Sequence, residues 1–163
     1  MEESKNHSLL VVVHPFYLIP MTLARQLNPE NFMPDYTPSY KGYRDYLENM
    51  VSLIRNHQGS LLCLEEDFIK RDLLKRHLSV WRGEKNFRIL GTKDDRAEPI
   101  KGWEEFDSIT DRHKDKEILC AGGQYYIAHS KGKDFEAGCL GTVVKRIREK
   151  GYNPLLVKEA IFS

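Results

Sequence analysis

The stretch that decides the fold is SLLVVVH, residues Ser8–His14, a continuous run of aliphatic and β-branched side chains. A strand without polar alternation has both faces buried, which is typical of a parallel sheet covered by helices on both sides. The segments SLLCLE (Ser60–Glu65) and EILCAGG (Glu117–Gly123) have the same character, and FRILG (Phe87–Gly91) and NPLLVKEA (Asn153–Ala160) are further candidates. The sequence therefore predicts several buried strands spread along the chain.

The segments between these strands have the apolar periodicity of helices. Apolar residues recur at helical spacing from Tyr43 to Ile54, from Ile69 to Trp81 and from Leu140 to Ile147, and a shorter helix is expected at Trp103–Ile109. Alternating strands and helices are typical of a sheet with helices on both faces. We therefore expect an α/β fold, a three-layer α/β/α sandwich with a mainly parallel sheet of five or six strands.

Length and charge limit the possible functions. A chain of 163 residues predicts a single domain over 1–163, with residues 1–7 as a disordered tail. The net charge of +1 favours neither nucleic acid nor a membrane surface as a partner. The longest apolar run, Leu9–Val13, is far shorter than the roughly 20 residues that span a bilayer.

The cysteine and histidine content indicates a reduced protein without a metal. Three widely spaced cysteines, with no Cys-x-x-Cys pair, predict free thiols and a cytoplasmic location. The six histidines are scattered without the spacing of metal ligands, so we expect neither a metal nor a cofactor. The Pro- and Tyr-rich segment 15–40 is expected to be a long loop, which is either functional or a contact surface of a homo-oligomer.

The carboxyl ends of the predicted strands are where an α/β sheet binds ligands. The residues that follow the strands are His14, Phe16 and Tyr17 after the first, Glu65–Asp67 after the second, Thr92–Asp95 after the third and Gly122–Tyr126 after the fourth. The acidic residues after the second strand are more simply explained as the acidic start of the next helix than as a cation site. A small-molecule ligand or substrate is the expected partner of this edge.

Cys139 is the strongest nucleophile candidate, because it opens a predicted helix. The helix dipole and the first-turn amides favour a thiolate, and flanking glycines at Gly138 and Gly141 would let a substrate approach the backbone. The alternative is a small residue packed where the helix begins, and the residues alone leave both open. Lys131 and Lys133, near this helix start, suit an anion, although no phosphate-binding motif is present.

The segment EILCAGGQYY…GCLGTVVKRIREKGYNPLLVKEAIFS resembles the isochorismatase-like cysteine hydrolases in the order of strand, cysteine-led helix, Gly-Tyr turn and last strand. The resemblance implies a parallel-sheet α/β fold with Cys139 as the nucleophile. It also implies His14 in place of the family's aspartate base and Lys101 as the nearest match to its lysine. The family's Asp-x-His metal motif is replaced by LEEDF.

Two functional hypotheses follow from the residues and the resemblance. The first is a divergent cysteine hydrolase that cleaves a C–N or ester bond of a small molecule, with catalytic residues Cys139, His14 and Lys101. The substrate-binding residues would be Phe16, Tyr17, Gly123, Gln124, Tyr125 and Gly138. The second is a catalytically inactive protein on the same scaffold that binds a small molecule or takes part in assembly.

Overall fold

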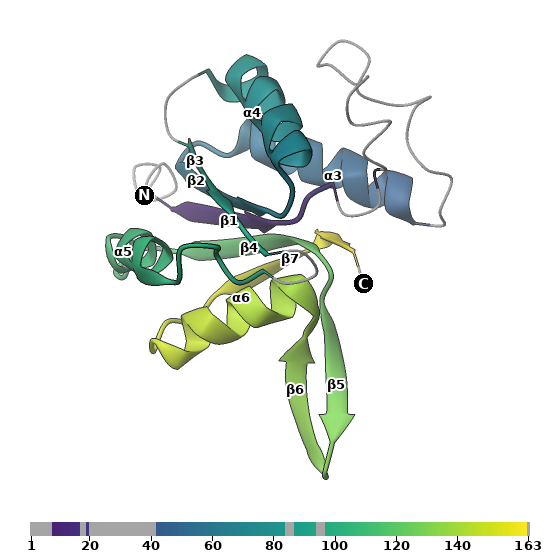
Figure 1. Cartoon of the computed structure of the whole chain (residues 1–163), viewed down its shortest axis with the longest axis vertical. Coiled ribbons are helices and arrows are strands. Elements are labelled where there is room, and N and C mark those ends of the chain that lie inside the picture. The colour runs from purple at the N-terminus through teal and green to yellow at the C-terminus, as the bar shows by residue number, and fades with distance from the viewer. Residues whose placement is uncertain (1–7, 17–18, 20–41, 84–86, 94–96, 163) are drawn as a thin grey trace.

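A five-stranded parallel sheet forms the centre of the molecule, as seen in a computed structural model that describes residues 8–16, 19, 42–83, 87–93 and 97–162 (Figure 1). The strands are β1 (Leu9–Val13), β2 (Ser60–Glu65), β3 (Phe87–Gly91), β4 (Ile118–Gly123) and β7 (Leu155–Phe162). Their spatial order is β3-β2-β1-β4-β7, and every neighbouring pair is parallel. The α/β prediction with a five-stranded sheet is confirmed.

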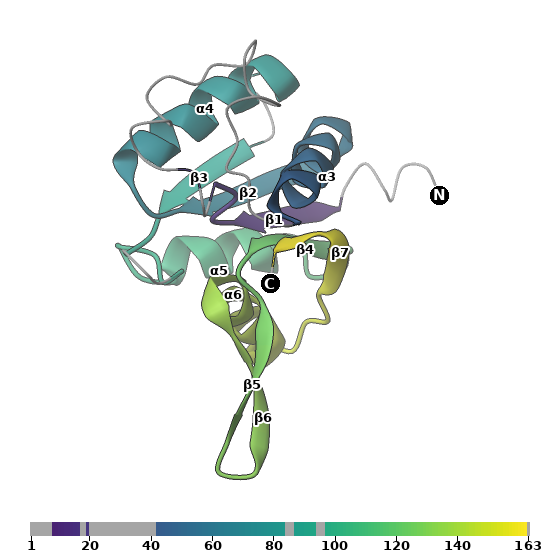
Figure 2. The ribbon, with the colours of Figure 1, turned by 90° about the vertical axis from the view of Figure 1, so that its right-hand side faces the viewer.

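Two layers of helices enclose the sheet (Figure 2). Helices α3 (Tyr43–Asn56) and α4 (Phe68–Arg82) cover one face, and α5 (Glu104–Asp111) and α6 (Gly138–Glu149) cover the other. Strand β1 lies between β2 and β4, so its side chains alternate between the two helical layers. This central position explains the uninterrupted apolar run, because each residue of β1 is fully buried.

The start of α4 corrects the interpretation of the acidic residues after β2 as a helical first turn. Asp67 is the N-cap of α4, and its Oδ1 accepts a hydrogen bond from the Ile69 backbone at 2.7 Å. Glu65 is instead the last residue of β2 and is completely buried. One of the three residues therefore caps the helix, while another belongs to the core.

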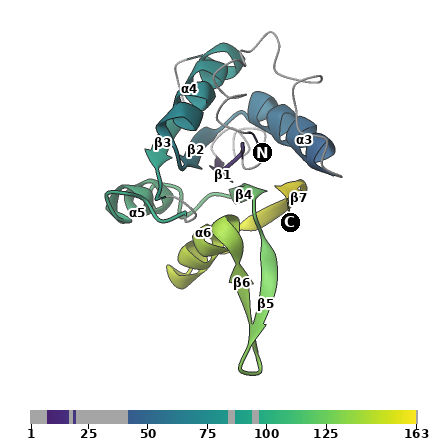
Figure 3. The same cartoon turned by 45° about the vertical axis from the view of Figure 1, so that its right-hand side comes forward.

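A two-stranded antiparallel hairpin, β5 (Tyr126–Ser130) and β6 (Lys133–Ala137), projects from the body between β4 and α6 (Figure 3). Lys131 and Gly132, both with positive φ, form its turn. This segment was expected to be a loop that brings Lys131 and Lys133 to the start of α6. That expectation is wrong, because the hairpin carries both lysines to its far end.

One face of the hairpin is apolar, and no described part of the chain covers it. Residues paired across the strands share a face, so Tyr126, Ala128, Phe135 and Ala137 lie together. Tyr126 is 47% exposed and Phe135 is 43% exposed. The hairpin therefore contributes nothing to the two cores that flank the sheet.

None of the helices within the described ranges is long and apolar enough to cross a membrane. The tail 1–7 and nearly all of the segment 15–40 lie outside the described residues, so the expectations for them remain predictions.

Candidate active site at the carboxyl edge of the sheet

The carboxyl ends of β1, β2 and β3 bring three polar residues, His14, Glu65 and Thr92, to one edge of the sheet. The parallel pairing continues one step past the strands, since the His14 amide donates to Leu64 O at 2.8 Å and the Thr92 amide donates to Glu65 O at 3.0 Å. All three residues are buried: His14 and Thr92 are 1% exposed and Glu65 is 0% exposed. Buried polar groups at the ligand-binding edge of an α/β sheet are candidates for function.

His14 holds a neutral imidazole at neutral pH. Burial lowers its pKa to about 4, an effect that Glu66 opposes and Lys70 reinforces. Its Nε2 lies 2.7 Å from Thr92 Oγ1, whereas Nδ1 is buried and finds no hydrogen-bond partner in the described part of the chain. The residue also has φ of 43°, a conformation that is uncommon outside glycine and asparagine. A buried histidine with a positive φ and a ring nitrogen that finds no partner among the described residues is unusual for a purely structural residue.

Glu65 is the second unsatisfied group at this edge. Its Oε1 accepts the Glu66 amide at 3.0 Å, while Oε2 has no partner among the described residues. Burial raises the pKa of Glu65 to about 7, although hydrogen bonds from the Glu66 and Phe16 amides and the charge of Lys70 oppose the shift. A carboxyl that titrates near neutrality can both accept and release a proton under physiological conditions.

The residues around this pair hold the segment after β2 in place. Lys70, on the first turns of α4, forms an ion pair with Glu66 at 3.2 Å. The Arg71 guanidinium donates to Glu66 O at 2.8 Å and lies against Gly91 of β3. These contacts leave the cluster with carboxylate, ammonium and imidazole groups within one small region.

Cys139 lies at the same edge, at the start of α6. Helix α6 begins at Gly138, and Cys139 is partly buried against the core on the α5 and α6 face. The Leu140 amide donates to Gln124 O at 3.0 Å, so the first turn of α6 rests on the residue that leaves β4. Gly138 is required here, because its φ is +84° and a Cβ would lie 2.2 Å from Gln124 O.

The register of β4 connects Cys139 with the end of β1. Gly122 pairs with Val13, and a Cβ on Gly122 would lie 2.0 Å from Val13 O. Gly123 and Gln124 therefore leave the sheet beside His14, and the α6 N-terminus follows them. The end of β4, to which the first turn of α6 is bonded, therefore neighbours the end of β1, while the His14 ring is hydrogen-bonded towards β3 through Thr92.

Tyr125 lies at the base of the hairpin and takes part in the hydrogen bonds that connect β6 with α6. Its hydroxyl donates to Glu136 Oε2 at 2.7 Å, and Arg148 Nε donates to Glu136 Oε1 at 2.8 Å. Burial and the bond to Glu136 raise the pKa of Tyr125 to about 12. These bonds tie β6 to α6 close to Cys139.

The remaining expected site residues lie elsewhere. Lys101 is exposed in the turn before α5, where it lines a hollow with Arg71 and Arg88 at the edge of β3. Phe16 is fully buried in the core beneath α3 and α4. Tyr17 lies outside the described residues.

The sequence places Glu65 and Thr92 at the ligand-binding edge but assigns neither of them a role, and the structure adds both to the site. A signal was present for Glu65, because the alternation Leu61, Cys63, Glu65 places it on a buried face of β2. Thr92 has no such signal, since its role depends on the ring of a residue 78 positions away.

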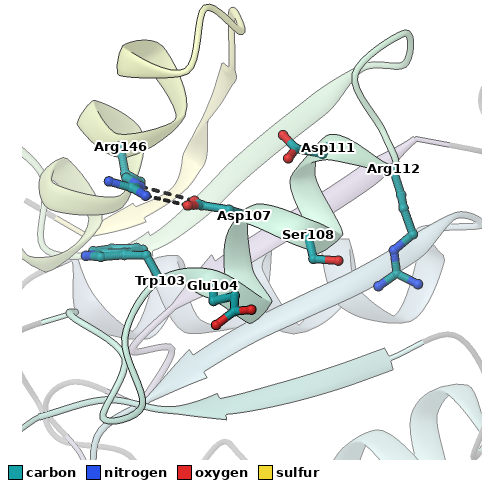
Figure 4. A pocket seen from close by; sticks show the side chains of 7 residues that line it. All are labelled: Trp103, Glu104, Asp107, Ser108, Asp111, Arg112 and Arg146. Carbon is teal, nitrogen blue, oxygen red and sulfur yellow. Dashed lines mark hydrogen bonds and ion pairs between the residues drawn. The ribbon is translucent and has the colours of Figure 1, made fainter.

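A hollow of about 790 Å³ lies away from this edge, between α5 and α6 (Figure 4). Arg146 donates to both carboxylate oxygens of Asp107 and lies 5.4 Å over the Trp103 ring. Lys150 pairs with Asp111 at 2.5 Å. The hollow is wide open, and the pair of Arg146 with Asp107 joins the two helices across it.

No group of three or more histidine, cysteine or acidic side chains among the described residues is arranged to hold a metal ion. Comparison with known proteins finds no matching family model, no matching curated protein and no matching solved structure.

Proposed function

We propose that the protein is a cysteine hydrolase of small amides or esters, with its site at the carboxyl edge of the sheet. The observation that supports the proposal is the pairing of Gly122 with Val13, which makes β4, the strand that leads to the cysteine-led helix, the neighbour of β1, the strand that leads to the buried His14. The resemblance of the C-terminal third to isochorismatase-like hydrolases supports the same assignment of Cys139.

In the proposed reaction, Cys139 Sγ attacks the substrate carbonyl carbon and the thiol proton passes to the His14–Glu65 pair. The C–N or C–O bond then breaks, and the leaving amine or alcohol takes up the proton. Water hydrolyses the thioester, which releases the acid and restores the thiol. The positive end of the α6 dipole favours both the thiolate and the oxyanion of the tetrahedral intermediate.

The other two cysteines provide internal controls. Burial raises the pKa of Cys63 well above its usual range and that of Cys120 to about 12. Neither thiol should react with an alkylating reagent in the folded protein. Free thiols also fit the proposed cytoplasmic location.

The test is the pH profile of iodoacetamide labelling, with each cysteine followed by peptide mass spectrometry. We expect Cys139 to label at least tenfold faster at neutral pH than a free thiol model, with no labelling of Cys63 or Cys120. Replacing Glu65 by Gln removes a carboxylate charge that disfavours the thiolate, so the labelling profile of Cys139 should move to lower pH. Release of nitrophenol from p-nitrophenyl acetate should disappear in Cys139→Ser.

The alternative is a catalytically inactive protein that binds a small molecule or takes part in assembly. Two observations favour it: His14 Nε2 is already bonded to Thr92, and Cys139 packs against apolar side chains. If Cys139 labels no faster than the free thiol, the hydrolase proposal fails and this alternative stands. Sedimentation of the native protein and Phe135→Asp would then show whether the apolar hairpin face forms a homo-oligomer.

A further inference from the structure

A groove follows the edge of β3, the outer strand, on the side where no strand of the described sheet pairs with it. Two adjoining hollows, of about 280 and 330 Å³, share Arg71, Arg88 and Ile89 in their walls. The first continues to Ile100 and Lys101, and the second to Lys75 and Phe87. The groove is therefore continuous along the strand and is separate from the site around Cys139.

The backbone in this groove offers unused hydrogen-bonding groups. In a parallel pair, alternate residues direct their N–H and C=O towards the neighbouring strand. The Thr92 amide bonds to β2, so Arg88 and Leu90 also face β2, and Phe87, Ile89 and Gly91 face outwards. Gly91 O accepts the Ile100 amide at 2.9 Å, but no partner is shown within the described chain for the outward groups of Phe87 and Ile89.

The side chains along this edge are cationic on both faces of the sheet. Arg71 and Lys75 extend from α4 on one face, and Arg88 bonds to Glu105 of α5 on the other. Lys101 precedes α5 and lines the same hollow as Arg88. Within the described ranges, Arg71, Lys75 and Lys101 form no ion pair with a carboxylate. The two carboxylates of the groove are paired, Glu105 with Arg88 and Asp72 with Arg76.

We propose that the edge of β3 binds an extended acidic peptide segment as an added strand. Successive side chains of such a segment point to opposite faces, so acidic residues at neighbouring positions would meet cations on both faces. The outward N–H and C=O of Ile89 would bond to the peptide backbone. The proposal is independent of the chemistry at Cys139.

A peptide probe separates strand addition from simple charge attraction. The probe is fluorescein-labelled octaglutamate, measured by anisotropy with the native protein at low salt. We expect saturable binding that weakens at least tenfold when every peptide nitrogen is methylated, because charge is retained while the backbone donors are lost. We expect octalysine not to bind.

Variants of the groove provide matched controls. Lys75→Glu with Lys101→Glu should weaken octaglutamate binding at least tenfold, whereas Lys116→Glu with Lys133→Glu makes the same charge change elsewhere and should alter it less than twofold. Ile89→Pro removes an outward N–H without removing a hydrogen bond to β2 and should abolish binding, while Ile89→Val should bind like the native chain.

Three results would overturn the proposal. Equal binding of the methylated peptide would show that charge alone attracts it. Displacement by glutarate at the same molar concentration as unlabelled octaglutamate would indicate a site for small anions. Unchanged binding by a folded Ile89→Pro would exclude the β3 backbone. If that variant does not fold, the methylated peptide decides the question on the native chain.

Discussion

Glu65 and His14 lie side by side at the ends of adjacent strands, and burial moves their pKa values in opposite directions. The neighbouring pair Val13 and Leu64 fixes this register, and the His14 amide extends it. Burial lowers the pKa of His14 from 6.5 to about 4 and raises the pKa of Glu65 from 4.5 to about 7. Both residues therefore favour their neutral forms in the folded protein.

The first prediction concerns the pH dependence of stability, in which the two residues oppose each other. His14 contributes stability above its unfolded pKa of 6.5 that is lost as the pH falls towards 4. Glu65 contributes stability below its unfolded pKa of 4.5 that is lost as the pH rises through 7. Each of the two contributions to the free energy of unfolding changes by about 3 kcal/mol, and the changes have opposite signs. The free energy of unfolding of the native sequence should therefore vary little between pH 4 and pH 7.

Single substitutions should separate the two contributions. In Glu65→Gln only the shift of His14 remains. The free energy of unfolding, measured by urea denaturation, should therefore fall by about 3 kcal/mol as the pH falls from 6.5, the pKa of unfolded His14, to about 4, its pKa in the folded protein. Asparagine tolerates the positive φ at position 14. In His14→Asn, the free energy of unfolding should instead rise by about 3 kcal/mol as the pH falls from about 7, the pKa of folded Glu65, to 4.5, its pKa in the unfolded chain. Profiles parallel to that of the native protein in both variants would contradict the assigned shifts.

The second prediction concerns the hydrogen bond between His14 and Thr92. Replacing Thr92 by Val keeps the shape but leaves His14 Nε2 buried without this partner. We expect a loss of about 1–3 kcal/mol in the free energy of unfolding, measured by urea denaturation near neutral pH. Thr142→Val is the matched control, because its hydroxyl bonds to Gly138 O on an exposed part of α6. Equal effects of the two substitutions would show that the buried bond contributes nothing particular.

The third prediction concerns the contact between Gly138 and Gln124. Gly138→Ala places a Cβ against Gln124 O and keeps a positive φ, so both strain and steric overlap oppose folding. Gly132→Ala, at the hairpin turn, has φ of +74° but meets nothing within 4 Å. We expect a cost of about 1 kcal/mol at Gly132 and clearly more at Gly138, compared by thermal unfolding. If Gly138→Ala lowers the stability no more than Gly132→Ala does, the first turn of α6 can move away from Gln124 without a loss of stability, which would contradict this prediction.

The fourth prediction concerns the relative stability of the hairpin. An isolated two-stranded ribbon is marginally stable in water, and β5 and β6 add no side chain to either buried core cluster. Hydrogen exchange should therefore be fastest for amides of β5 and β6 and slowest for β1, which is paired on both sides. Strong protection of Ala128 and Phe135 in a dilute sample would instead indicate that another molecule covers the apolar face.

The sequence predicted the sheet and its helices because both depend on local patterns. The apolar runs became strands with nearly the expected bounds, as at Ser60–Glu65 and Phe87–Gly91. The hairpin was missed although Lys131-Gly132 is a turn signal, because neither of its strands carries the continuous apolar run that marks β1, β2 and β4.

The site was harder to predict than the sheet. Strand ends can be located from sequence, so Cys139 and His14 were placed at the right edge. The direction of the His14 ring depends on a positive φ and on distant Thr92, neither of which has a local pattern. Lys101 was selected only as the nearest match to the lysine of the family that the chain resembles, and the fold places it in a hollow at the outer strand.

The bond between Leu140 and Gln124 closes the base of the hairpin. The two places where the ribbon leaves and rejoins the body therefore meet, and β4 connects to α6 as an ordinary strand-to-helix turn would. The ribbon is in this sense an insertion whose length and sequence the sheet does not constrain. The chain can therefore vary or exchange this arm through evolution, or accept a different peptide by design, while the edge that holds His14 and Glu65 keeps its geometry.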